Sequence, residues 1–165
     1  MTSATPPLTV TSGDVDAASR ILTAAALALE ARGEPLWPPH TLTPERLLRH
    51  YPAASWRVAW DGALAAACLS LLPHDPLFWP DDAPGDALYL HKLAVHPDAQ
   101  GRGLAAWMLD HAAREARVRG VGALRLDTAT ARPKLRALYE GHGFTPVGRR
   151  TVLGFDVTLY TLPLA

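Results

Sequence analysis

Apolar residues recur along this chain at spacings that predict alternating helices and strands. Residues 14–33 place apolar side chains at steps of three and four, which predicts an amphipathic helix, and the same spacing returns over residues 103–120. Shorter helices are predicted over residues 43–51 and 133–143, where a proline occupies the first turn. The chain therefore contains about four predicted helices.

Runs of strand-forming residues separate these helices. Residues 55–73 read as two strands joined at Asp61-Gly62, a dipeptide typical of a hairpin turn. Only the middle of the chain has the strand–helix–strand order that favours parallel pairing, and the last two strands are expected to be antiparallel. We predict an α/β (α+β) fold with a mixed central sheet of about six or seven strands. The remaining strands are predicted at residues 7–11, 87–95, 123–128, 145–153 and 156–164.

Composition narrows the class of protein. The chain has 165 residues, of which 48% are hydrophobic and 19% charged, so we expect one globular domain over residues 1–165. A formal net charge of zero argues against a nucleic-acid or membrane-surface partner. No apolar run of membrane-spanning length and no secretory signal pattern is visible. The single cysteine, Cys68, leaves no intramolecular disulfide, and a cytoplasmic location is expected.

The stretch HPDAQGRGLAAWML, residues 96–109, carries the strongest chemical signal. A glycine turn that opens a helix presents unpaired N–H groups and a partial positive charge, which suits a phosphate. Gly101–Ala106 satisfies the dinucleotide pattern G-x-G-x-x-G/A, with Asp127 where a ribose-binding acid is sought. Five residues separate this turn from its strand, however, and the chain offers few parallel strands. Both observations argue against a dinucleotide-binding domain. A nucleoside-triphosphate loop is excluded because no Gly-Lys-Ser/Thr occurs.

The same turn also matches a third pattern, Q/R-x-x-G-x-G/A, over Gln100–Ala105. It follows a strand ending LAVHP and precedes an amphipathic helix, and LRLDTATARPKLRALYEGHGF comes next. Over residues 88–148 the chain resembles the GNAT (general-control-related N-acetyltransferase) superfamily. The resemblance implies the GNAT fold, acetyl-CoA as cosubstrate, no metal, and acetyl transfer by direct attack of a primary amine of a small molecule or peptide. It also implies a possible homodimer.

The resemblance assigns CoA-binding residues. Backbone N–H groups of the glycine turn would hold the pyrophosphate, and the end of the preceding strand would pair with the pantetheine arm. Arg132 stands where many members have a CoA-contacting asparagine; it would reach the CoA phosphates or face solvent. The turn residues are Gln100, Gly101, Arg102, Gly103, Leu104 and Ala105, and the strand residues are Leu93, Ala94 and Val95.

Catalytic residues are implied less directly. Tyr139 matches the tyrosine that often protonates the leaving thiolate, although a core position beside Phe144 is the alternative. The family often uses a glutamate base in the strand before the turn. Here LYLHKLAV has no carboxylate, so His91 is the candidate base. A structural histidine and a water chain to backbone carbonyls remain open as alternatives.

Two proline-rich loops are candidates for the acceptor site. Trp37, His40 and Trp79, with Tyr51, His74 and Asp75 nearby, could line an aromatic, partly polar pocket or simply fix the loops to the core. Cys68 lies in an apolar strand and is expected to be a buried small side chain. The histidine spacing predicts no metal site. A CoA-binding sensor with little catalysis and a nicotinamide-dependent oxidoreductase remain the rival functions.

Overall fold

The computed structural model describes residues 7–164, and this part of the chain falls into two compact units. The first unit contains the described residues up to Ser70 together with Lys92–Met108. The second contains Leu71–His91 together with the described residues from Leu109 onward. Two strands and one helix contribute to both units, and each unit is described by itself below.

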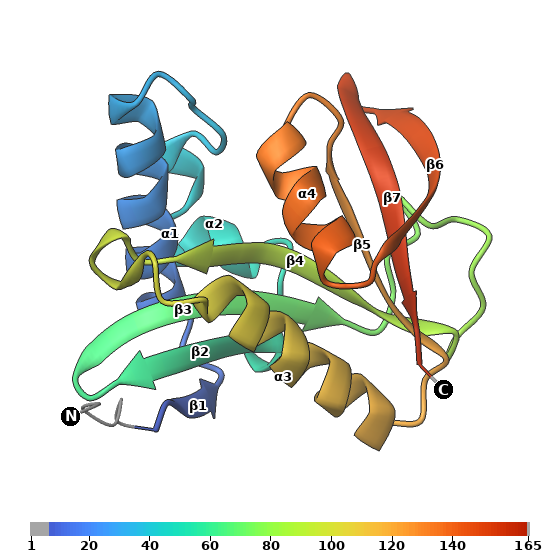
Figure 1. Cartoon of the computed structure of the whole chain (residues 1–165), viewed down its shortest axis with the longest axis horizontal. Coiled ribbons are helices and arrows are strands. Elements are labelled where there is room, and N and C mark those ends of the chain that lie inside the picture. The colour runs from blue at the N-terminus through green and yellow to red at the C-terminus, as the bar shows by residue number, and fades with distance from the viewer. Residues whose placement is uncertain (1–6, 165) are drawn as a thin grey trace. The chain divides into compact units, whose positions relative to one another are not determined.

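The first unit is built on antiparallel strands and two helices that pack together (Figure 1). Asp14 accepts a hydrogen bond of 2.9 Å from the N–H of Ala17 and so caps the first helix. Thr43 caps the second in the same way. The elements are β1 (Thr9–Ser12), α1 (Val15–Ala31), α2 (Pro44–Leu48), β2 (Trp56–Asp61) and β3 (Leu64–Leu72), with short 3₁₀ turns at Pro39–Thr41, Ala53–Ser55 and Pro97–Ala99.

The core of the first unit lies between α1 and the strands. Ile21 and Leu22 are fully buried on α1, and Trp56 and Cys68 are fully buried on β2 and β3. The predicted hairpin between these strands is confirmed, because Gly62 takes a φ of +60°, which the tight turn requires.

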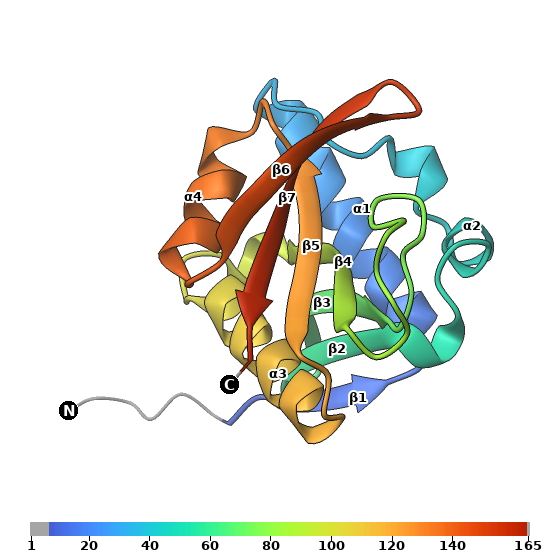
Figure 2. The ribbon, with the colours of Figure 1, turned by 90° about the vertical axis from the view of Figure 1, so that its right-hand side faces the viewer.

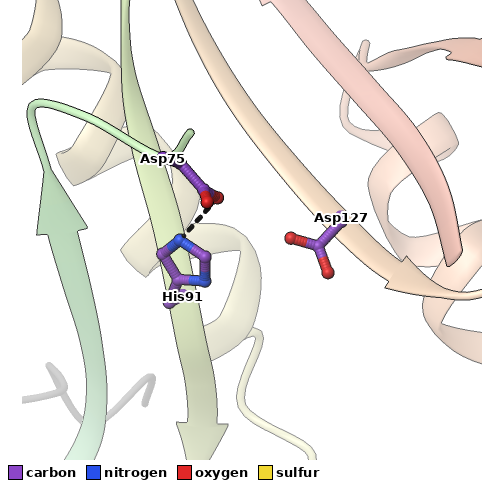
Figure 3. Close-up of side chains that lie close together, drawn as sticks. All are labelled: Asp75, His91 and Asp127. Atoms are coloured by element: carbon purple, nitrogen blue, oxygen red, sulfur yellow. Dashed lines mark ion pairs between the residues drawn. The ribbon is translucent and has the colours of Figure 1, made fainter. Parts of the chain in front are cut away.

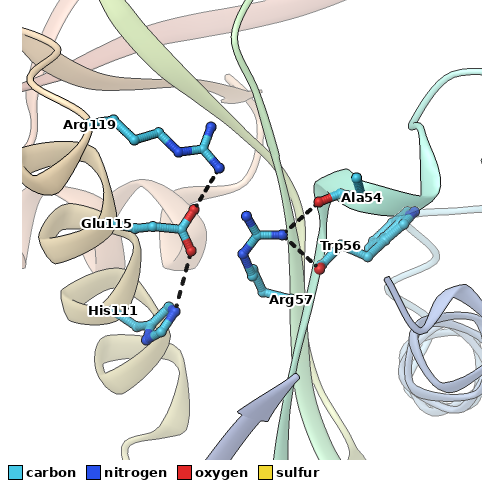
Figure 4. Close-up of polar contacts among 6 residues, drawn as sticks. All are labelled: Ala54, Trp56, Arg57, His111, Glu115 and Arg119. Carbon is cyan, nitrogen blue, oxygen red and sulfur yellow. Dashed lines mark hydrogen bonds and ion pairs between the residues drawn. The ribbon is translucent and has the colours of Figure 1, made fainter. Parts of the chain in front are cut away.

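Arg57 and Glu115 both have polar partners close to them in the sequence (Figure 4). Arg57 on β2 is buried, and its Nη1 donates to the carbonyl oxygens of Ala54 and Trp56 at 2.8 and 2.9 Å. These bonds offset the cost of taking the guanidinium out of water. In the second unit, Glu115 pairs with side chains four residues away in either direction, His111 and Arg119.

The second unit contains three strands that lie side by side in Figure 2. The central strand of the three, β7, pairs antiparallel with both β5 and β6. Its register with β5 runs from Ala123↔Pro163 to Ala129↔Val157. Helix α4, which comes before these last two strands in the chain, packs against β6. The elements are β5 (Ala123–Ala129), α4 (Pro133–Gly141), β6 (Thr145–Val152) and β7 (Phe155–Pro163).

Strand β4 (Ala87–Val95) and helix α3 (Leu104–Val118) contribute to both units, and the last two residues of β3 also belong to the second. Strand β4 pairs with β5 in parallel, with Ala87 opposite Ala123, as the strand–helix–strand order predicts. Across residues 7–164 the strands follow the order β1-β2-β3-β4-β5-β7-β6, in a seven-stranded mixed sheet accompanied by four α-helices. The predicted fold class is confirmed. None of the described helices combines the length and apolar character needed to cross a bilayer.

Candidate active site

The glycine turn forms the N-terminus of α3, as predicted. Gly101 and Gly103 have φ values of +79° and +72°, a region that L side chains rarely adopt. The carbonyl of Gly103 accepts the N–H of Trp107 at 3.0 Å, so the helix begins directly after this glycine. A Cβ atom added to either glycine would have no described neighbour within 4 Å. The turn therefore presents the first N–H groups of α3 to open space.

Two side chains of the turn are fixed to nearby elements of the first unit. Gln100 Nε2 donates to the carbonyl oxygen of Val95 at 3.0 Å, which ties the turn to the end of β4. Arg102 Nη1 lies 2.5 Å from Asp61 Oδ2, at the end of β2. Arg102 thus places a positive charge at the turn, but its guanidinium is paired with Asp61, a residue that the sequence analysis assigned only to the hairpin.

Strand β4 changes direction just before the residues assigned to the pantetheine arm. Lys92 has a φ of +56°, unusual for a residue with a side chain and indicative of a local kink. Beyond it, Ala94 is buried, whereas Leu93 and Val95 are half-buried. No sequence signal marks this kink.

Cys68 is a buried thiol in the first unit. Its Sγ lies 3.7 Å from the carbonyl oxygen of Lys92, and burial raises the pKa of the thiol far above its usual range. A thiolate nucleophile is therefore disfavoured at this position. The expected role as a small buried side chain is confirmed.

Three titratable side chains converge in the second unit (Figure 3). His91 Nε2 on β4 lies 3.0 Å from Asp75 Oδ2, which belongs to the loop after β3. Asp127 on β5 joins them, because one ligand atom from each of the three residues lies within 4.8 Å of the others. The side chains of His91 and Asp75 are 14% and 8% exposed. We call these three residues the Asp–His–Asp cluster.

The strand register explains why His91 and Asp127 meet. Tyr89 and Arg125 are partners across the parallel β4–β5 pair. Side chains two residues further along each strand return to the same face, which brings His91 and Asp127 together. Sequence reasoning considered Asp127 only as a ribose ligand, because the pairing of β4 with β5 in this register cannot be read from either strand alone.

The loop that carries Asp75 is anchored by a second acidic residue, Asp82. Its Oδ2 accepts hydrogen bonds from the Tyr89 hydroxyl at 2.5 Å and from Arg125 Nη1 at 2.6 Å. The Arg125 guanidinium also lies 5.2 Å from the ring centre of Trp79. Trp79 thus helps to fix this loop to the strands, which was one of the two predicted roles; its acceptor-binding role stays a prediction.

Tyr139 on α4 is 7% exposed and packs against two aromatic rings of the second unit, Phe144 and Tyr160. Burial raises the pKa of its hydroxyl, and the negative charge of Asp127 raises the same pKa further. The phenol therefore keeps its proton at neutral and mildly alkaline pH. The predicted core packing is observed, and the charge interaction with Asp127 relates the same hydroxyl to the Asp–His–Asp cluster.

The remaining candidates lie in several elements. Trp37 is half-buried against the core of the first unit, with the Lys92 ammonium 4.8 Å from its ring centre. His40 is exposed in the Pro39–Thr41 turn of the same unit. Arg132 is half-buried at the N-cap position of α4, where its backbone N–H donates to Ala129 O at 3.0 Å. Their proposed ligand contacts stay predictions.

The Asp–His–Asp cluster also has the side-chain types that bind divalent cations. The sequence analysis did not anticipate this grouping, because its members come from a loop and two strands. The absence of a metal requirement thus stays a prediction, and chelation tests it below.

Comparison with known proteins identifies the family. Residues 23–144 match the acetyltransferase (GNAT) family, which is most of the chain. The chain belongs to this family, and the resemblance stated from the glycine turn is confirmed. The match begins within α1 of the first unit and ends after α4 of the second.

Individual proteins agree with this assignment. The mycothiol acetyltransferase of Beutenbergia cavernae is 41% identical over 96 residues, covering 58% of this chain and 30% of that protein. The [ribosomal protein bS18]-alanine N-acetyltransferase of Salmonella typhimurium is 41% identical over 59 residues, covering 36% of this chain and 40% of that protein. The chain thus matches less than half the length of either curated relative.

A solved structure shows the same fold at low identity. The putative acetyltransferase yncA of Salmonella typhimurium, determined with its cofactor acetyl-CoA, superposes with a TM-score of 0.69 at 19% identity. The alignment covers 96% of this chain and 94% of that one.

Proposed function

We propose that this protein is an acyl-CoA-dependent N-acyltransferase that transfers acetyl from acetyl-CoA to a primary amine of a small molecule or peptide. The observation that carries the proposal is the glycine turn Gln100–Ala105, which opens α3 inside a segment matched by the acetyltransferase family. Its exposed N–H groups suit the pyrophosphate of CoA. We further propose that Leu93–Val95 align the pantetheine arm and that Arg132 supplies charge for a CoA phosphate.

In the proposed reaction the amine nitrogen attacks the thioester carbonyl carbon, forming the C–N bond while the C–S bond breaks. His91 takes the proton that the amine loses, and Asp75, 3.0 Å from its Nε2, stabilises the resulting imidazolium. Tyr139 gives a proton to the departing CoA thiolate. Its hydroxyl remains protonated at the pH of the reaction, so a proton is available there for the transfer.

The test is acetyl-CoA turnover against a panel of primary amines. The reaction is monitored by the release of the free CoA thiol. We expect N-acetylated product and stoichiometric free CoA. Tight acetyl-CoA binding without turnover of any amine would favour the sensor function instead. A parallel titration with NAD(P)H tests the oxidoreductase alternative. Strong NAD(P)H binding without CoA binding would overturn the proposal.

Removal of metal ions tests the cation alternative for the cluster. Dialysis against a chelator such as EDTA should leave the rate of acetyl transfer unchanged, because the proposed steps use only the chain's own side chains. Loss of activity on chelation, with recovery on adding Zn²⁺ or Mg²⁺, would assign the cluster to a metal.

Further proposals concern the whole molecule. Residues 1–165 would act as one acyltransferase domain, supported by a family match that crosses from one compact unit into the other. A cytoplasmic location is supported by the single buried thiol, which suits a reducing compartment. Trp37, His40 and Trp79 are proposed to contact the acceptor. A homodimer is an expectation that light scattering on the purified protein would test.

A further inference from the structure

An ion pair between Arg102 and Asp61 lies at the glycine turn of the first unit. Arg102 is the one charged residue of the segment Gln100–Ala105. Its Nη1 lies 2.5 Å from Asp61 Oδ2, and the two side chains are 33% and 23% exposed. Within residues 7–164 neither side chain has another ion-pair partner. The guanidinium of the turn is therefore engaged by a carboxylate.

The backbone of the hairpin sets the position of Asp61. This residue ends β2 and directly precedes Gly62, whose φ of +60° makes the tight turn. The register of β2 with β3 shifts between Ala59 and Trp60, just before Asp61. A bulge of this kind bends a strand and changes the direction in which its next side chains point. The carboxylate is thus presented to Arg102 by the local geometry of the hairpin.

The glycine turn has other contacts that hold it in place. The N–H of His96, at the start of the segment that leads to the turn, donates to the carbonyl oxygen of Ala66 on β3 at 2.8 Å. Gln100 Nε2 donates to the carbonyl oxygen of Val95 at 3.0 Å. A partly exposed ion pair adds little stability to a segment that is already held by such bonds. The main effect of Asp61 is therefore on the charge that the turn presents.

The pairing lowers the attraction of the turn for a phosphate. A guanidinium that is bonded to a carboxylate contributes almost no net charge, and its N–H groups are directed at the carboxylate oxygens. A phosphate bound at the N–H groups of α3 would compete with Asp61 for Arg102, and the Asp61 carboxylate would repel it. The backbone N–H groups are not affected by this competition.

We infer that Asp61 limits the affinity of this protein for CoA, because its carboxylate competes with the CoA pyrophosphate for Arg102. The backbone N–H groups of Gln100–Ala105 then supply most of the phosphate binding. Asp61 acts through Arg102 and touches no reacting atom, so it determines cosubstrate affinity and is not a catalytic residue. This inference rests on the proposed N-acyltransferase function and adds a residue of the hairpin to its CoA site.

The experiment measures CoA affinity by calorimetry in the wild type, Asp61→Ser, Arg102→Gln and the double variant. Serine replaces the aspartate because an Asn-Gly sequence would deamidate and restore the carboxylate. We expect Asp61→Ser to bind CoA at least about threefold more tightly at low salt, the effect of removing one charge about 6 Å from a phosphate in water. At about 1 M salt this gain should nearly disappear, because the charges are screened.

The double variant tests whether Asp61 acts through Arg102. Arg102→Gln should cost more CoA affinity in the Asp61→Ser background than in the wild type, because only there is the guanidinium available to the phosphate. An equal or smaller cost in that background would overturn the inference, since Arg102 would then meet the phosphate regardless of Asp61.

The matched control is Asp98→Ser, which removes the same charge four residues before Arg102. Asp98 lies in the Pro97–Ala99 turn with its side chain 78% exposed, and its Oδ2 is 3.9 Å from His96 Nδ1. This variant should leave CoA affinity nearly unchanged. An equal gain in Asp98→Ser and Asp61→Ser would overturn the inference, because the effect would then be one of overall charge. The midpoint of thermal unfolding shows that each variant is folded.

Two further outcomes separate the inference from the proposed function. Unchanged or weaker CoA binding in Asp61→Ser would overturn the inference and make the ion pair a brace for the turn, while acetyl transfer by the wild type would still stand. No CoA binding by the wild type or any variant, together with no acetylation in the amine panel, would refute the proposed function and this inference together.

Discussion

The chemistry proposed for His91 and Tyr139 depends on their immediate neighbours. An imidazole beside a buried carboxylate is well placed to accept a proton, because the carboxylate stabilises the positive charge that forms. A phenol buried near Asp127 has the opposite tendency, since burial and the adjacent negative charge both hold its proton in place. One region of the second unit therefore contains an imidazole next to a carboxylate and a phenol that stays protonated.

Replacing His91 with alanine should lower kcat by about 10²- to 10⁴-fold, the usual contribution of a positioned general base. The affinity for acetyl-CoA should change little, because the glycine turn belongs to the first unit. Steady-state kinetics and calorimetric CoA titration measure the two effects. Added imidazole should restore part of the rate, a recovery that a merely structural histidine would not show.

Replacing Tyr139 with phenylalanine should lower turnover more than CoA affinity. The aromatic contacts with Phe144 and Tyr160 persist in the variant, so the fold is retained and only the proton donor is lost. Pre-steady-state release of the CoA thiol measures the step directly. An unaltered rate would return Tyr139 to a packing role alone.

At the scale of single elements, the turn before α3 and the kink in β4 shape the proposed CoA site. Both depend on backbone conformation: two glycines with positive φ in the turn, and Lys92 at +56° in the strand. The helix supplies N–H groups and a dipole, and the glycines keep side chains away from them. Ligand binding at such a site depends little on which side chains are present. It depends strongly on whether the phosphate can reach the backbone N–H groups.

The chain offers a matched pair of glycines to test this access. Gly103 and Gly33 have the same φ of +72°, and a Cβ on either would meet open space. Replacing either with tryptophan should cost about 1–2 kcal/mol of unfolding free energy through backbone strain. Only Gly103→Trp should abolish binding of CoA, measured by calorimetry, because only its side chain would occupy the phosphate position. Equal CoA affinity in the two variants would contradict the proposed site.

At the scale of the whole molecule, several buried acids influence stability in the same direction. Burial raises the pKa of Cys68, Tyr89, Tyr139 and Tyr160 above their ordinary values. In the unfolded chain such groups ionise between about pH 8.5 and 10. The folded chain retains these protons to higher pH, so above this range the unfolded state binds fewer protons than the native state.

The free energy of unfolding should therefore be nearly independent of these groups below about pH 8 and should fall as the pH rises past 10. Urea unfolding at pH 8 and pH 10.5 measures the change in midpoint. Tyr139→Phe and Cys68→Ala should each reduce the pH dependence, since each removes one ionising group. A midpoint that rises with pH would contradict the assigned direction of the pKa shifts.

Local signals in the sequence predicted most of the fold. Asp14 and Thr43 cap helices where the pattern places them, and Gly62 forms the expected hairpin turn. Each of these features is set by residues within a few positions of one another. The kink at Lys92 was not predicted, because nothing in the neighbouring residues demands a positive φ there.

The sequence by itself determined the order of helices and strands, the glycine turn that opens α3 and the family, because each depends on residues close together in the chain. The tertiary structure alone decided which distant side chains meet. Asp75, His91 and Asp127 come from a loop and two strands, and only the parallel register of β4 with β5 and the Asp82 anchor bring them together. Strand pairing and loop docking are non-local, so the local pattern does not contain them.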